Sequence, residues 1–198
     1  MKKYAIWIVL GLILFVTFIL LMWGVSSYNG LVSSRENVNK TWSNVENQYQ
    51  RRLDLIPNLV NTVKGAADFE KSTLEAVTQA RANATGIKLD ANDLTPEKLQ
   101  QYEQAQAQLS GALSRLLVSV EKYPELKATQ NFSELQAQLE GTENRINEAR
   151  RQYNDAAQSY NEGRLKFPKV IIANMFGFTT RPYFEAAKGA EKAPEVKF

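Results

Sequence analysis

The sequence lacks cysteine and histidine entirely across its 198 residues. Without cysteine there are no disulfides, thiolate metal sites or cysteine nucleophiles. Without histidine the commonest metal ligand and general base is missing, so His- or Cys-based zinc sites and Ser-His-Asp catalysis cannot form within this chain alone. Glycine-rich phosphate loops and metal-ligand spacings are missing as well. The sequence therefore offers no candidate catalytic, cofactor-binding or metal-binding residue, and we expect no cofactor.

The sequence also lacks a block of positive charge. It carries 24 Lys and Arg against 21 Asp and Glu, and two of these cations, Lys2 and Lys3, precede a long apolar run. The remainder is close to neutral. A protein that binds nucleic acid without sequence preference concentrates cations on one face. We therefore expect no nucleic-acid partner.

The apolar run at residues 4–25 contains no charged residue. As a helix it would extend roughly 33 Å, enough to cross the hydrocarbon core of a bilayer. Trp7 lies near one end and Trp23 near the other, as is typical of rings at the headgroup boundary. A cleaved signal peptide is the alternative, but this run is long for one and no good A-x-A cleavage site follows it. We interpret the run as a retained single-pass anchor.

The orientation of this anchor depends on a small difference in flanking charge. Lys2 and Lys3 favour a cytoplasmic N-terminus, whereas Arg35 and Lys40 on the other side nearly balance them. We predict a protein of the bacterial cell membrane, the inner membrane in a Gram-negative cell. Its remaining chain is predicted on the outer, periplasmic or extracellular, side.

The rest of the chain reads as helices with one apolar stripe each. Residues 26–85 predict a very long helix that kinks or breaks at Pro57, followed by a loop at 83–94. Thr95 and Pro96 then suit the start of a second helix, which carries a buried stripe. The members of that stripe are Leu99, Tyr102, Gln106, Leu109, Leu113, Leu116 and Val120.

A third long helix follows, and prolines mark two shorter ones. Asn131 with Glu134 resembles a capping box at the start of the long helix. Pro168 and Pro182 are each predicted to open a short helix. Strand-like alternation of useful length is lacking, so helices with single apolar stripes must pack against each other.

We therefore predict an all-α fold, an antiparallel up-and-down bundle of about four helices with one N-terminal transmembrane helix. A coiled coil is also compatible with the spacing, but the widened stripes favour packing within one chain. The expected organisation, in chain order, is a short flank at 1–3, the anchor at 4–25, the bundle at 26–188 and a flexible tail at 189–198.

Several segments of the chain resemble the LemA family, and the resemblance covers nearly the whole sequence. The most specific of them is RLDLIPNLV at 52–60. The resemblance implies a bacterial source and a membrane-anchored helical bundle, and it implies no catalytic residues. The other matching segments are YPELKA at 123–128, NFSELQAQLEGTENRINEARRQYN at 131–154 and FPKVIIANMFGF at 167–178.

Four charged residues fall on otherwise apolar stripes and are candidates for a polar seam inside the bundle. Lone buried charges are costly, so such residues are usually paired. They would either hold a ligand or partner carboxylate, or fix the register of the helices, and we favour the second role. These residues are Arg35, Arg52, Glu70 and Arg81.

A cluster near the C-terminus is richer in apolar residues than one stripe requires. It would either cap the end of the bundle, which we favour, or contact a partner or the membrane surface. Its members are Val170, Ile171, Ile172, Met175, Phe176 and Phe178.

These observations favour a non-enzymatic scaffold or adaptor that binds other membrane-associated proteins. Two alternatives stay open. One is a small-ligand receptor or enzyme that uses the Arg/Glu seam, and a preformed pocket at those residues would favour it. The other is a self-associating protein that organises the membrane, for which homo-oligomerisation would be needed.

Overall fold

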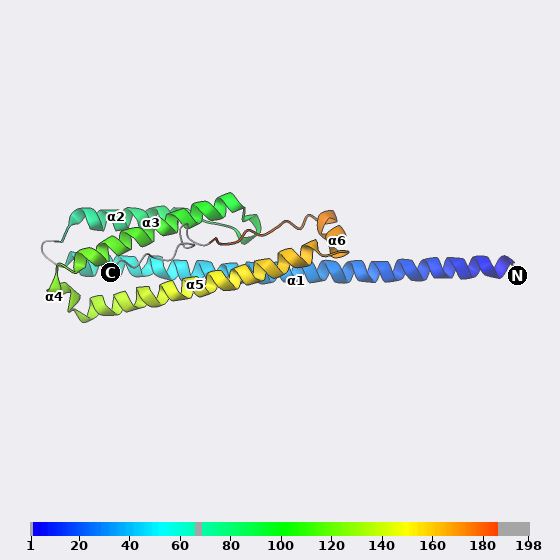
Figure 1. Ribbon diagram of the computed structural model, residues 1–198, viewed down its shortest axis with the longest axis horizontal. Helices are drawn as coiled ribbons and strands as arrows, with labels where there is room; N and C mark the ends of the chain where they lie inside the picture. Colours follow the sequence, from blue (N-terminus) through cyan, green and yellow to red (C-terminus); the bar gives the residue numbers. More distant parts are fainter. Residues whose placement is uncertain (1, 66–68, 186–198) are drawn as a thin grey trace, which may run out of the picture. The chain divides into compact units, whose positions relative to one another are not determined.

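The computed structural model describes residues 2–65 and 69–185, so the tail expected at 189–198 lies outside the described residues. Within the described ranges all regular structure is helical, which confirms the all-α prediction (Figure 1). The helices are α1 (Lys2–Lys64), α2 (Lys71–Gly86), the 3-10 turn η1 (Ala91–Asp93), α3 (Pro96–Val120), α4 (Pro124–Lys127), α5 (Gln130–Leu165) and α6 (Lys169–Met175).

The chain forms two compact units, and α1 and α5 contribute to both. Unit 1 comprises the chain up to Lys40 together with Asp155–Arg181. Unit 2 comprises Thr41–Asn154 and the chain from Pro182 onwards.

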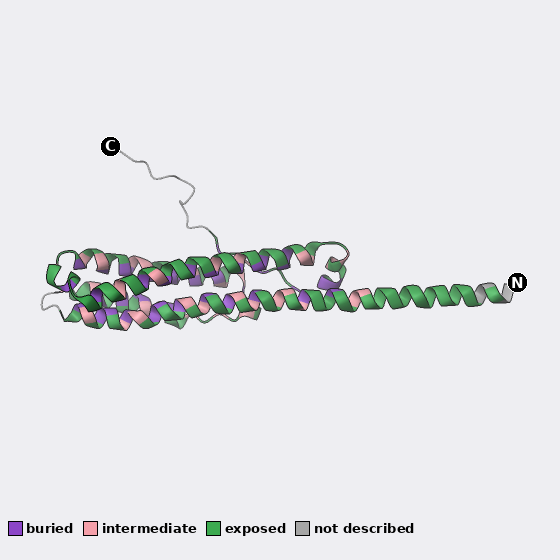
Figure 2. Cartoon of the chain, turned by 90° about the horizontal axis from the view of Figure 1, so that it is seen from below, coloured by how far each residue is buried: buried purple, intermediate pink, exposed green. Residues whose placement is uncertain are grey.

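Unit 2 is a bundle in which α1, α2, α3 and α5 run alternately up and down (Figure 1). All four helices contribute to one apolar core, to which α4 adds Leu126. Every member of the stripe predicted on α3 is buried, including its one amide, Gln106. The buried positions recur along the helices at the spacing of an amphipathic pattern (Figure 2).

Of the kink or break predicted at Pro57, the break is wrong, because α1 continues through Pro57 to Lys64. Proline has no N–H to bond the carbonyl four residues earlier, which is that of Leu53. The side chain of Arg81 on α2 supplies the missing donor, since its Nε bonds the Leu53 carbonyl oxygen at 2.9 Å. The helix therefore passes the proline without leaving this carbonyl unpaired.

Two helix boundaries also differ from the prediction. Helix α2 continues to Gly86, so the loop begins four residues later than the predicted residue 83. Helix α5 begins at Gln130, and the Thr129 hydroxyl accepts a bond from the Phe132 N–H at 3.4 Å. Thr129 is therefore the cap, and the prediction of Asn131 as the cap was wrong. The predicted cap of α3 is confirmed, since Thr95 accepts from the N–H of Lys98.

From Phe178 to Glu185 the described chain forms no helix, so the short helix predicted to open at Pro182 is wrong over these residues. In unit 1 the Asn161 amide bonds both the N–H and the C=O of Arg181, at 2.9 and 2.8 Å. In unit 2 the Asn154 amide does the same for Phe184, at 2.9 and 3.0 Å. The segment satisfies its backbone through side chains of α5, so it needs no helix of its own.

Candidate functional site

The most polar buried position in unit 2 is Arg52, whose side chain is only 3% exposed. Its guanidinium donates to the Ser110 hydroxyl and the Glu143 carboxylate, each at 3.0 Å, and to the side-chain oxygen of Gln106. It also lies over the ring of Tyr49, 5.1 Å from the centroid. Charge-assisted bonds of this kind offset the cost of burying the cation. We call these five residues the Arg52 cluster.

A second ion pair lies within unit 2. Arg150 bonds the Glu103 carboxylate at 2.6 Å and the carbonyl of Glu185 at 3.1 Å, and its guanidinium stacks on the ring of Phe184. Burial raises the pKa of the Glu103 carboxyl, and the attraction of Arg150 opposes this rise without outweighing it. Burial likewise raises the pKa of the Tyr49 hydroxyl. Both groups are thus held protonated to a higher pH than usual.

A hollow of about 510 Å³ joins these two sets of residues. A second hollow shares Gln104 and Ala107 with the first and continues along α3 past Gly111 to Arg115. We call the two together the α3 groove. The walls of the first hollow are Tyr49, Arg52, Gln100, Glu103, Gln104, Gln106, Ala107, Ser110, Glu143, Arg150 and Glu185.

The chemistry of the α3 groove is hydrogen bonding. The guanidinium groups of buried Arg52 and half-buried Arg150 each face a carboxylate, which leaves amides and hydroxyls as the main polar groups along the walls. Such a surface can position a polar ligand or a polar helix. Glu103, with its raised pKa, is the wall residue best suited to hold or release a proton.

The four residues predicted as a polar seam each have their own partners. Arg35, in unit 1, lies over the ring of Phe178, 5.4 Å from its centroid. In unit 2, Glu70 is half-exposed and pairs with Lys122 at 3.9 Å. Arg81 bonds a backbone carbonyl beside Pro57. Of the four predicted residues, only Arg52 lines the α3 groove.

The sequence reasoning missed most partners of Arg52. Glu143 and Ser110 lie on other helices and break no pattern in the sequence. Arg150 lies in a charged stretch between Glu148 and Arg151 and stands out by no pattern, yet it forms the ion pair with Glu103. The one usable signal was Gln106, an amide at a position where the stripe of α3 is otherwise apolar or aromatic.

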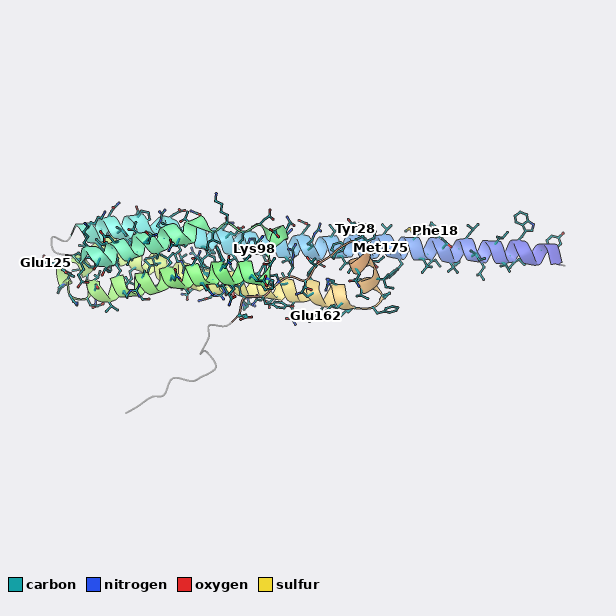
Figure 3. All side chains as sticks on the ribbon, turned by 90° about the horizontal axis from the view of Figure 1, so that it is seen from above. Phe18, Tyr28, Lys98, Glu125, Glu162 and Met175 are labelled. Carbon is teal, nitrogen blue, oxygen red and sulfur yellow. The ribbon has the colours of Figure 1, made fainter. Side chains whose placement is uncertain are left out.

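The apolar cluster predicted near the C-terminus belongs to unit 1, and the structure divides it. Ile172 and Phe178 are buried, and Val170 is half-buried. Ile171, Met175 and Phe176 are exposed. Figure 3 shows the Met175 side chain beside α1, near the level of Tyr28. The cluster thus combines a packed inner face with an exposed outer one, where Phe176 still contacts the ring of Tyr28.

These features define an all-α bundle associated with a membrane. Among the described residues, one helix, α1 from Trp7 onwards, has the length and composition to cross a bilayer. A family model described as the LemA family matches residues 41–198. The chain belongs to the LemA family, as its sequence segments indicated.

Several characterised bacterial proteins are similar to the chain. Magnetosome protein MamQ of Magnetospirillum gryphiswaldense is 26% identical over 195 residues, covering 89% of this chain and 69% of that protein. Magnetosome protein MamQ 2 of Paramagnetospirillum magneticum is 26% identical, covering 80% and 64%. Protein LemA of Metamycoplasma hominis is 23% identical, covering 83% and 71%. The match thus spans about two thirds of the length of the magnetosome proteins.

Proposed function

We propose that this protein is a membrane-anchored, non-enzymatic scaffold that holds other proteins at the bacterial cell membrane. The observation that carries the proposal is the continuity of α1, a single helix of 63 residues. Its N-terminal part has the composition of a membrane span, and its last turns carry core residues of unit 2. The anchor and one helix of the bundle are therefore parts of the same continuous helix, α1, as a protein tethered to the membrane requires.

In this proposal residues 4–25 cross the membrane once and the bundle begins at residue 26. The flanking lysines Lys2 and Lys3 support a cytoplasmic N-terminus, with the bundle on the outer side. The pairing of Arg52 and Arg150 with carboxylates supports a structural role for these charges.

The α3 groove is the docking surface that we propose for a protein partner. Ala107 and Gly111 lie one turn apart on its wall, and small residues let a second helix approach closely. Glutamines on both sides of this small-residue strip offer donors and acceptors to a polar helix face. The expected occupant is an amphipathic helix with a polar seam.

Filling the groove tests this assignment. A Cβ built at Gly111 meets no atom within 4 Å, so Gly111→Leu projects into open space and should leave the fold intact. Gly141 on α5 is equally open, which makes Gly141→Leu the matched control. Cross-linking in native membranes should capture a reproducible partner with the wild type and with Gly141→Leu, and several-fold less with Gly111→Leu.

Three results would count against the proposal. Capture that is equal for both leucine variants removes the groove from the interface. Capture that an anchor-only fragment reproduces removes the bundle altogether. Capture of only a second copy of this chain favours a self-associating, membrane-organising protein.

A small-ligand receptor is the second candidate, and the hollow beside Arg52 favours it. The Nε of Arg52 is buried without a hydrogen-bond partner among the described residues, so one donor remains for a polar ligand. Thermal unfolding of the purified protein with a library of small polar metabolites tests this candidate. A ligand that raises the melting temperature of the wild type but not of Ser110→Leu would establish it.

A further inference from the structure

The outer face of the segment around α6 is the most exposed apolar surface in unit 1 outside the membrane span. It consists of four side chains that are each at least half exposed. They are Phe167 (82%), Ile171 (50%), Met175 (68%) and Phe176 (57%). We call them the α6 patch. Ile172 and Ala173, on the opposite side of the same helix, are buried.

The inner face of this segment covers α1 at the end of the apolar run. A Cβ built at Gly24 would lie 4.0 Å from the Cδ1 of Ile172. One turn further on, Ser27 is buried, and the ring of Tyr28 packs edge-on against one side of Phe176, with centroids 4.9 Å apart, while the rest of Phe176 stays exposed in the α6 patch. Helix α6 therefore contacts α1 at a level that still belongs to the uncharged stretch.

The level of this contact decides what surrounds the α6 patch. Gly24 lies about 6 Å before Tyr28 along the helix axis, at roughly 1.5 Å per residue. Trp23 and Tyr28 are the rings expected at the headgroup boundary. If they lie there, α6 lies at the same depth, with its outer face turned away from α1.

We propose that the α6 patch is a second membrane contact, inserted into the headgroup region of the bilayer that α1 crosses. Interfacial segments bury apolar and aromatic side chains at this depth and keep cations beside them. Lys166 and Lys169 are exposed next to the patch and suit lipid phosphates, although Lys166 also pairs with Glu162 at 3.9 Å. The occupant of the patch is thus lipid, and the contact is continuous with the span of α1.

The absence of cysteine from the chain makes a direct depth measurement simple. The full chain, placed in nanodiscs of phosphatidylglycerol and phosphatidylcholine, is labelled with a polarity-sensitive fluorophore on a single introduced cysteine. Met175→Cys reports on the patch, Phe18→Cys on the span and Glu162→Cys on a polar surface of unit 1. All three positions are labelled in Figure 3.

The proposal predicts three distinct depths. The label at position 175 should be blue-shifted and quenched several-fold more by spin labels near the headgroup than by deep ones, and the label at 18 should show the reverse. The label at 162 should stay unquenched. A label at 175 that behaves like the one at 162 overturns the proposal.

Oxidation of the native side chain provides a second measurement without a fluorophore. In nanodiscs, Met175 should be oxidised to the sulfoxide by chloramine-T several-fold more slowly than a reference methionine introduced by Glu162→Met. Equal rates overturn the proposal. Protection that is found in native membranes but not in lipid-only nanodiscs also overturns it, because a protein partner would then cover the patch.

Discussion

The two ends of α1 are both helical, but their apolar side chains are distributed differently around the helix. From Trp7 to Met22 every side chain is exposed, although nearly all of them are apolar. From Thr41 to Lys64, within unit 2, buried apolar residues recur every three or four positions, with polar and charged residues between them. The first end presents apolar surface on all sides, and the second presents it on one side only.

The difference shows what each end requires from its surroundings. An all-round apolar helix has no separate inner face, so it needs an apolar surrounding on every side, such as a lipid bilayer provides. The second end, which is apolar on one side only, packs its apolar stripe against other helices. These helices also supply hydrogen-bond partners at its two irregular positions, Arg52 and Pro57. Arg52 bonds side chains of α3 and α5, and Arg81 serves the carbonyl that Pro57 leaves unpaired.

The largest expected effect comes from charging the exposed end. The double variant Leu14→Lys/Phe18→Lys places two cations near the centre of the apolar run, at a cost of about 5–7 kcal/mol for insertion. Most of the protein should then leave the membrane fraction in a carbonate wash, while circular dichroism still shows the bundle. The control, Val45→Lys, charges a fully buried position and should unfold the bundle without releasing the anchor. Retention of the double variant in the membrane would contradict our interpretation of the run.

The fold could be predicted from the sequence because it depends on the spacing of apolar residues and on the residues at the helix ends. The stripe of α3, its cap at Thr95 and the short helix α6 between Pro168 and Gly177 all follow from spacing and local chemistry. Gly177 has a φ of +69°, which glycine adopts without strain.

The candidate site could be predicted only in part, because it depends on contacts between distant segments. A proline in a helix predicts a break unless a donor from elsewhere reaches the freed carbonyl, and Arg81 lies 28 positions away from Leu53. Asn154 and Asn161 likewise hold the extended chain near Phe184 and Arg181, a role that no local pattern reveals.

The second prediction tests the asymmetry of the buried ion pair in the one-sided end of α1. Glu143 is 48% exposed whereas Arg52 is buried, so Glu143→Ala leaves an unpaired cation in the core. We expect a loss of about 2–4 kcal/mol in the free energy of unfolding. Adding Arg52→Met should recover part of this loss, because methionine needs no counter-charge. Urea unfolding of the single and double variants measures both effects, and a double variant less stable than Glu143→Ala would contradict the pairing.

The third prediction concerns the proline in the same region. Arg81→Met should cost about 1–3 kcal/mol by leaving the Leu53 carbonyl unpaired. In a Pro57→Ala background the new N–H can bond that carbonyl, so the cost of Arg81→Met should fall by about 1 kcal/mol. A double-mutant cycle by urea unfolding gives the coupling directly. Equal costs in the two backgrounds would mean that Arg81 stabilises the bundle by some other contact.

The smallest expected effect is a pH dependence of the free energy of unfolding, which comes from Glu103 on α3 and Glu46 on α1. The pKa of Glu103 is raised above its usual 4.5 because burial outweighs the attraction of Arg150. A raised folded-state pKa means that the folded protein holds the proton more tightly than the unfolded chain does. The stabilisation from this group is therefore complete below pH 4.5 and is lost as the pH rises through the raised value.

Glu103→Gln should remove that component, so its urea midpoint should fall less than that of the wild type as the pH rises from 4.5 towards 7. Burial also raises the pKa of Glu46, so Glu46→Gln serves as the comparison and removes a separate part of the same slope. A wild-type midpoint that instead rises over this range, with Glu103→Gln abolishing the rise, would show that the attraction of Arg150 outweighs burial. The ion pair would then stabilise the bundle most at neutral pH, and the paired charges beside the α3 groove would resemble a surface salt bridge more than a buried one.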